Sequence, residues 1–246
     1  MHAFLKKKFG QNFLVDKNIV KKIAQLLPDK KIDVIEIGPG NGKLTDELLN
    51  HTLLNLTLVE IDKDLIENLN FKYRQFKYVK IINEDILKYE INKKYDLAIS
   101  NLPYNISSQV LVKLCLLQHL PINLILMFQK EFAERLISEK LNSLNSLVGC
   151  FYDISTSIGV SKNCFRPIPK IDSSVLLFKR RNEILLKRNE IDNFIKFKRN
   201  LFSHKRKTLK NILKDFDLDH NKFDLSLRVE EISLQELLRI FRETNL

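Results

Sequence analysis

Apolar residues in the first half of the chain form short continuous runs, separated by stretches in which apolar positions recur every three or four residues. Short apolar runs bounded by turn residues are typical of buried strands, and the wider spacing is typical of helices. The runs predict five strands, at 32–37, 56–59, 78–82, 95–99 and 124–128. Helical spacing between and after them, for example at 107–117 and 131–138, predicts an α/β fold built on an open sheet.

The pattern changes in the second half of the chain. Two further strand candidates, at 154–160 and 174–178, are close enough to be antiparallel neighbours at a sheet edge. The C-terminal part keeps only helical spacing, and one of its helices is opened by a capping box from Ser233 to Glu236. We therefore expect an α/β domain over 1–184 and a small all-helical, basic domain over 185–246.

The charge of the chain indicates a polyanionic partner. Lys and Arg number 41 against 30 Asp and Glu, which gives a net charge of +11. Nearly all of this surplus lies between Lys179 and Lys214, where 13 basic residues face three acidic ones. Such a block predicts a surface that follows nucleic-acid phosphates, with a solvated helix face as the alternative. The candidate RNA-binding residues are Lys205, Arg206, Lys207 and Lys210.

Several classes of protein are disfavoured by composition. Three widely separated cysteines predict no disulfide framework, and neither they nor the five histidines have the spacing of metal ligands. We therefore expect no metal. The N-terminal residues turn basic without the apolar core of a signal peptide, and no segment is apolar enough to span a membrane. These features predict a cytoplasmic protein without a membrane partner.

Each of four successive predicted strands ends in a group that could bind a ligand, and these ends lie at one edge of the sheet. The first runs into a glycine-rich turn that includes Gly38 and Gly40, where a ligand can approach the backbone closely. The next strand ends in Glu60, which suits two hydrogen bonds to ribose hydroxyls, and the third delivers Asp85, which could accept from an adenine amine. The alternatives are a surface Glu60 that opens a helix and an Asp85 that caps the turn after it.

The fourth strand ends in the tetrad from Asn101 to Tyr104, which suits methylation of an exocyclic amine on a nucleobase. The lone pair of such an amine is delocalised into the ring. The Asn101 side-chain oxygen and the Leu102 carbonyl can each accept one N–H and favour the pyramidal geometry in which nitrogen attacks. Pro103 disfavours the α conformation at Leu102. A simple turn after a strand is the alternative.

Aromatic side chains are expected to hold the unstacked base. Tyr104, the last residue of the tetrad, offers one ring face. Phe165 lies in a proline-stiffened loop at 164–170 that also carries two cations, and we expect it to be the opposite face of a stacking clamp. Packing of Phe165 in the core is the alternative.

Together the motifs identify a family resemblance. The chain resembles the ribosomal RNA adenine N6,N6-dimethyltransferases, and most closely the KsgA type that modifies small-subunit rRNA. The resemblance runs almost from end to end. It rests on FGQNFL at 9–14, EIGPGNGKLT at 36–45, EDIL at 84–87, NLPYNIS at 101–107, FQKEFAERL at 128–136, FRPIPKIDSSV at 165–175 and HKRKTLKNIL at 204–213.

The resemblance implies a Rossmann-like class I methyltransferase that binds S-adenosylmethionine. Asn12 and Leu14 would touch the methionine end of the cofactor, and Gly38 and Gly40 would let it lie against the turn. Glu60 would bind the ribose and Asp85 the adenine, while Asn101 would sit between cofactor and target. The implied substrate is a pair of adjacent adenosines in the hairpin loop near the 3′ end of small-subunit rRNA, presented within an assembling subunit. Nothing in the sequence demands a dimer.

Three other functions are weighed against this one. The related macrolide-resistance (Erm) type dimethylates an adenine of large-subunit 23S rRNA, but Gly10, Pro39 and the sequence at 170–172 favour the small-subunit type. A nicotinamide oxidoreductase is disfavoured by the tetrad and by the lack of a general acid pair. A non-catalytic ribosome assembly factor on the same fold stays open.

Overall fold

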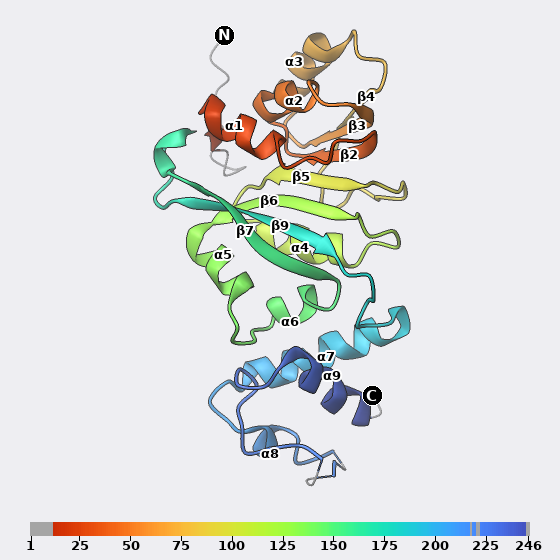
Figure 1. The fold of residues 1–246 in the computed structure, drawn as a ribbon, viewed down its shortest axis with the longest axis vertical. Helices are drawn as coiled ribbons and strands as arrows, with labels where there is room; N and C mark the ends of the chain where they lie inside the picture. The colour runs from red at the N-terminus through yellow and green to blue at the C-terminus, as the bar shows by residue number, and fades with distance from the viewer. Residues whose placement is uncertain (1–11, 217, 220–221, 245–246) are drawn as a thin grey trace. The chain divides into compact units, whose positions relative to one another are not determined.

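The computed structural model describes residues 12–216, 218–219 and 222–244 (Figure 1). The chain packs as two compact units, one formed by 1–134 with 154–180 and the other by 135–153 with 181–246. The functional division expected from the sequence, at 184/185, stays a prediction. Packing differs from it by grouping residues 135–153 with the C-terminal helices.

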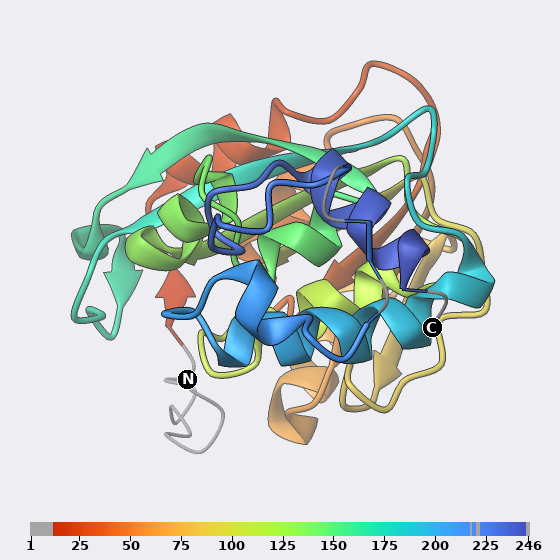
Figure 2. The same ribbon diagram turned by 90° about the horizontal axis from the view of Figure 1, so that it is seen from below.

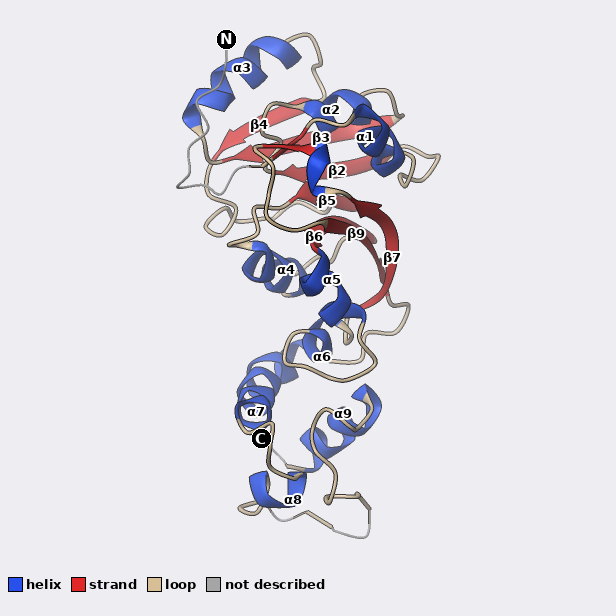
Figure 3. Cartoon of the chain, turned by 90° about the vertical axis from the view of Figure 1, so that its left-hand side faces the viewer, coloured by secondary structure: helices blue, strands red, loops and turns tan. Residues whose placement is uncertain are grey.

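In the described part of the chain, seven strands form the main sheet in the order β4-β3-β2-β5-β6-β9-β7 (Figures 1 and 3). Their bounds are β2 Ile32–Ile37, β3 Leu53–Glu60, β4 Val79–Asn83, β5 Leu97–Asn101, β6 Asn123–Gln129, β7 Tyr152–Val160 and β9 Ser173–Arg180. The first five in sheet order are parallel, and β9 runs antiparallel to β6. The five predicted strands are confirmed, as are the two later candidates, which are neighbours at the edge of the sheet.

Two of the helices that connect the strands begin at an aspartate that caps their first turn. The bounds of the connecting helices are α1 Lys17–Ala24, α2 Lys43–Leu48, α3 Lys63–Tyr73, α4 Ser107–Cys115 and α5 Lys130–Ile137. Asp16 caps α1, because its side chain accepts hydrogen bonds from the backbone N–H groups of Asn18 and Ile19 at 2.8 and 3.1 Å. Asp62 caps α3 in the same way through Asp64.

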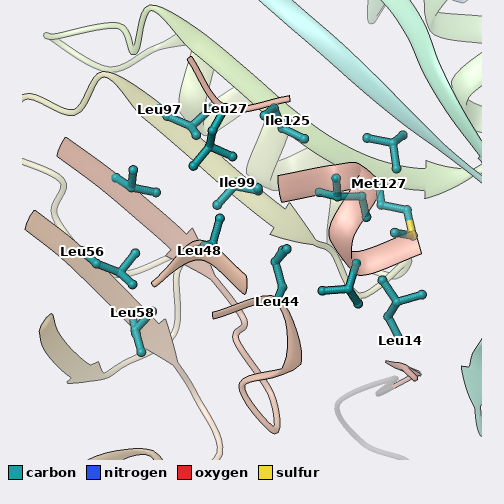
Figure 4. Packing of buried hydrophobic residues seen from close by; sticks show 14 of the residues in the cluster. Leu14, Leu27, Leu44, Leu48, Leu56, Leu58, Leu97, Ile99, Ile125 and Met127 are labelled. Carbon is teal, nitrogen blue, oxygen red and sulfur yellow. The ribbon is translucent and has the colours of Figure 1, made fainter. Parts of the chain in front are cut away.

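The hydrophobic core holds the central strands in place (Figure 4). Leu56 and Leu58 on β3, Ile99 on β5 and Leu48 on α2 are each completely shielded from solvent. Full burial of one such side chain contributes about 1.5–3 kcal/mol. Because these residues come from the strands on either side of β2 and from a covering helix, the strand ends that follow them are fixed relative to one another.

The N-terminal motif lies only partly within the described residues. Of the stretch at 9–14, residues 9–11 fall outside them. Phe13 and Leu14 form β1, which pairs antiparallel with β8 at Phe165–Arg166, so that Leu14 lies opposite Phe165. A 3-10 turn, η2, covers Lys162–Cys164 just before β8.

The second unit is helical, with α6 at Asn145–Val148, η3 at Arg188–Glu190, α7 at Ile191–Ser203, α8 at Leu209–Ile212 and α9 at Leu234–Glu243. Helices α7 to α9 are blue in Figure 2. Phe241 of α9 packs against Phe194 and Phe197 of α7, with ring centroids 5.2 and 5.4 Å apart. Ser233 caps α9 by accepting from the Glu236 N–H at 3.1 Å, which is one of the two hydrogen bonds of the predicted capping box. None of the helices in the described residues is long and apolar enough to cross a membrane.

Candidate active site

One cavity of about 350 Å³ opens at the carboxyl ends of the parallel strands in the first unit. It is lined by the glycine turn, the end of β3, the segment after β4, the tetrad after β5 and residues 12–14. All seven predicted cofactor-binding residues line it, namely Asn12, Leu14, Gly38, Gly40, Glu60, Asp85 and Asn101. The structure therefore brings together groups that are up to 89 positions apart in the chain, and their individual roles stay predictions.

The glycine turn between β2 and α2 leaves room for a ligand. Gly38 has a φ of +67°, and no atom lies within 4 Å of the place where a Cβ would be. Gly42, with a φ of +76°, instead packs so closely that a Cβ would lie 2.2 Å from the Tyr73 hydroxyl oxygen. Gly38 thus provides close access to the backbone, whereas Gly42 anchors the turn to α3.

Glu60 joins the glycine turn to the end of β3. Its side chain is 5% exposed, and its two oxygens accept from the backbone N–H groups of Gly40 at 3.1 Å and Asp62 at 2.9 Å. Burial raises the pKa of Glu60, while these hydrogen bonds lower it. The surface alternative is wrong, because Glu60 is buried and Asp62 caps the helix. A carboxylate has about four acceptor sites, so two bonds leave capacity for ligand hydroxyls.

Asp85 closes a turn and also lines the cavity. Its side chain accepts from the Leu87 N–H at 2.9 Å, and its carbonyl accepts from Lys88 and Tyr89, both at 2.8 Å. The two interpretations of Asp85 that the sequence left open, cavity residue and cap, therefore describe the same side chain.

Asn101 is held with its oxygen available to accept a hydrogen bond. Its side-chain nitrogen donates to the backbone carbonyl of Asn12 at 3.2 Å. Because a carbonyl can only accept, this bond assigns the NH₂ end of the amide to Asn12 and leaves Oδ1 as the other end. An acceptor of that kind is what the proposed chemistry requires at this position.

The rest of the tetrad is fixed by the start of α4. Ile106 N–H donates to the Pro103 carbonyl at 3.2 Å, and the Ser107 hydroxyl donates to the Tyr104 carbonyl at 3.1 Å. The Tyr104 hydroxyl lies 2.7 Å from the Ser173 hydroxyl on β9, and burial raises the pKa of Tyr104. Leu102 is 1% exposed. Hydrogen bonds thus hold the tetrad as a turn that lines the cavity.

Phe165 does not lie where the clamp requires it. Its side chain is 0% exposed and belongs to the core cluster, and it is absent from the cavity lining. Phe165 on β8 lies opposite Leu14 on β1, and both side chains belong to the core cluster. The expectation of a free Phe165 face opposite Tyr104 is therefore wrong for this structure, and the alternative of core packing holds.

Glu36 is a cavity residue that the sequence did not single out. It is 2% exposed and accepts a hydrogen bond from the Thr45 hydroxyl at 2.7 Å. Burial, followed by the nearby carboxylates of Asp46 and Glu60, raises the pKa of Glu36 to about 8. The available signal was an acidic residue inside an otherwise apolar strand.

The candidate RNA-binding residues belong to the second unit. Lys205, Arg206 and Lys207 lie in the turn after α7, and Lys210 lies on α8. All four side chains are exposed. Among the residues whose positions are described, no group of three or more His, Cys, Asp or Glu could hold a metal ion.

A family model described as ribosomal RNA adenine dimethylase matches residues 3–245. The chain belongs to the ribosomal RNA adenine dimethylase family. It is an S-adenosylmethionine-dependent methyltransferase of class I fold that dimethylates adenine in rRNA, which rules out the nicotinamide oxidoreductase.

Relatives and solved structures agree with the family. The chain is 41% identical to ribosomal RNA small subunit methyltransferase A of Malacoplasma penetrans, over 87% of this chain and 79% of that protein. It is 37% identical to the protein of the same name from Mycoplasma mobile, over 99% of each. A dimethyladenosine transferase from Plasmodium falciparum superposes with a TM-score of 0.82 at 25% identity, covering 95% of this chain and 98% of that chain. The 23S rRNA methyltransferase ErmE gives 0.74 at 25% identity, covering 96% and 100%.

The residues of this rRNA adenine dimethylase fit its cofactor. Gly38 gives open space at the backbone, and buried Glu60 keeps acceptor capacity for ribose hydroxyls. Asp85 provides a carboxylate at the wall formed after β4, where an adenine amine could donate. The combination of apolar walls and a few placed polar groups is typical of a site for a small ligand.

The pKa of Glu36 predicts a pH effect on stability. In the folded chain Glu36 keeps its proton up to about pH 8, whereas in the unfolded chain it releases it near 4.5. Between these values the folded state binds more protons, so this group makes stability fall as pH rises. Glu36→Gln cannot titrate and should reduce that fall in urea unfolding measured between about pH 5 and about pH 8.

Glu67→Gln is the control, because Glu67 is exposed. Its stability should follow the wild-type pH dependence. Parallel curves for the wild type and Glu36→Gln would show that Glu36 is ionised throughout.

Proposed function

We propose that this chain transfers two methyl groups to N6 of each of two adjacent adenosines in the 3′-terminal hairpin loop of small-subunit (16S) rRNA, within an assembling small ribosomal subunit. The observation that best supports methyl transfer to an amine is the orientation of the Asn101 side chain at the cofactor cavity. The choice of substrate is supported by relatives 41% and 37% identical that are named as small-subunit methyltransferases. Work on an assembling subunit would place the chain in the cytoplasm, and we expect it to act as a monomer.

The cofactor supplies an electrophilic methyl group when it is bound. Asn12 and Leu14 would hold its methionine end, and Glu60 and Asp85 its nucleoside. These side chains line one cavity, so binding would require little rearrangement of the strand ends.

The tetrad would orient the target amine. Asn101 Oδ1 accepts one N–H and the Leu102 carbonyl the other, which turns the nitrogen lone pair toward the methyl group. No strong base would be needed, because the N–H proton becomes acidic only as the new C–N bond forms. The methyl–sulfur bond would break in the same step, the cofactor would leave as a neutral thioether, and the proton would pass to solvent. After the first transfer only one N–H remains, so the second transfer is oriented by a single acceptor.

Tyr104 would stack on the adenine after it leaves its helix. Its hydroxyl is held against Ser173, which limits rotation of the ring. A base that is flipped out loses stacking worth a few kcal/mol, and contact with an aromatic face offsets part of that loss.

The large-subunit alternative is supported only by general likeness. ErmE shares the fold and a quarter of the sequence over nearly the whole chain, but relatives at higher identity carry the small-subunit name.

Replacing Asn101 tests the catalytic assignment. The Kd of Asn101→Ala for S-adenosylmethionine should stay within about threefold of the wild-type value. Its kcat for methyl transfer should fall by about 100-fold or more, the scale of losing one positioned polar group in an active site. Calorimetry and transfer of labelled methyl groups to undermethylated small subunits measure the two effects. Asn92→Ala, at an exposed position, is the control and should leave both unchanged.

Unaltered turnover in Asn101→Ala would remove Asn101 from the mechanism. The same variant, returned to cells that lack the enzyme, separates catalysis from an assembly role. Recovery of growth without methylation would support the non-catalytic function.

Reversing the charge at Lys205, Arg206 and Lys207 to Glu tests the RNA surface. RNA affinity should fall. The plot of log affinity against log salt concentration should become less steep, by roughly 0.7–0.9 for each phosphate that the protein no longer neutralises. The matched control reverses Lys77, Lys80 and Lys94, which are exposed on the first unit. Equal effects in both triple variants, or an unchanged slope in the first, would place the RNA surface elsewhere.

A further inference from the structure

Lys113 on α4 forms hydrogen bonds to the turn at 85–89, and part of this turn lines the cavity. Its ammonium donates to the backbone carbonyls of Leu87 at 3.0 Å and Tyr89 at 2.7 Å. The residue is half-buried, and neither the family motifs nor the tetrad includes it. Its position, nine residues after Tyr104, places the bond on the helix that the tetrad opens.

These bonds complete the fixing of the turn at 85–89. Within the turn, Asp85 accepts from the N–H groups of Leu87, Lys88 and Tyr89. Asp85 thus accepts the hydrogen bonds of three N–H groups of the turn, while Lys113 donates to the carbonyls of Leu87 and Tyr89. Leu87 is held at both its N–H and its carbonyl, and residues 84–87 line the cavity.

Acidic residues surround Lys113 and partly offset the effect of its burial. Burial lowers the pKa of Lys113, and the carboxylates of Asp85, Glu84 and Glu90 oppose this effect without reversing it. A cation here also offsets the repulsion among three acidic residues in a seven-residue stretch. Hydrogen bonds from a charged donor are stronger than those between neutral groups, so Lys113 restrains the turn more firmly than a neutral side chain would.

We propose that Lys113 is a positioning residue of the cofactor site, which holds the 85–89 turn so that Asp85 meets the adenine end of S-adenosylmethionine. The inference rests on the proposed function, since the role of Asp85 toward adenine belongs to it. Lys113 also connects two parts of the site, because its side chain links α4, the helix that follows the tetrad, to the turn that contains Asp85. It acts through these groups and does not touch the reacting atoms.

The test is cofactor affinity measured without RNA. Lys113→Met keeps an unbranched apolar side chain of similar length and removes the charge and the donors. By calorimetry its Kd for S-adenosylmethionine should rise about tenfold, the scale of losing a charge-assisted bond that orients a binding group. The Kd for 5′-methylthioadenosine, which keeps the adenine and ribose but lacks the amino-acid part, should rise by the same factor. At saturating cofactor, kcat and the KM for RNA should stay within about twofold of the wild type.

Two further variants separate positioning from general stability. Lys113→Arg retains the charge and donors and should recover most of the affinity, whereas Lys94→Met, at an exposed position, should bind as the wild type does. A Lys113→Met chain that melts at a lower temperature yet binds both ligands with wild-type affinity would overturn the proposal. So would a fall in kcat, or a rise in the KM for RNA, by a factor as large as the rise in Kd. Absence of S-adenosylmethionine binding by the wild type would overturn the proposed function as well, whereas equal binding by wild type and Lys113→Met would overturn this inference alone.

Discussion

The site depends on the parallel register of β2, β3, β4 and β5. In that register Ile37 lies beside Val59, Glu60 beside Asn83 and Glu36 beside Ile99, so the strands end at nearly the same level. Groups that follow the strand ends therefore meet at one edge of the sheet, and the apolar residues below them prevent the strands from sliding. A shift by one residue would turn each core side chain to the opposite face, which makes the register costly to change.

Hydrogen bonds between segments then convert this edge into a specific site. Three sets of hydrogen bonds each join two segments of the cavity lining or its support. Gly40 N–H donates to Glu60, the Asn101 side-chain amide donates to the Asn12 carbonyl, and the Lys113 ammonium donates to carbonyls of the 85–89 turn. In each of these bonds a side chain of one segment meets a backbone group of another, so the segments that line the cavity are connected to one another. Preorganisation of this kind lets placed dipoles act on a reaction without the energetic cost of reorienting them.

The parts of the fold that could be predicted from sequence are those with a local cause. The strands follow from apolar runs and the shared edge from their order, so the glycine turn, Glu60, Asp85 and Asn101 could be placed in advance. Asn12 and Leu14 were expected there only from the family resemblance. Phe165 could not be placed, because its burial depends on pairing with Leu14, about 150 positions earlier. Glu36 and Lys113 were missed for a similar reason. Their partners, Thr45 and the 85–89 turn, come close only through tertiary packing, and segment 135–153 joins the second unit in the same way.

The most direct test of the account is transfer of labelled methyl groups from S-adenosylmethionine to undermethylated small subunits and, separately, to large-subunit RNA. The modified nucleosides should be identified and mapped after digestion. The account predicts dimethyladenosine at two adjacent positions in the 3′-terminal hairpin loop of the small-subunit RNA, and none in the large-subunit RNA. Label confined to large-subunit RNA, or small subunits that are bound tightly but carry no label, would contradict it.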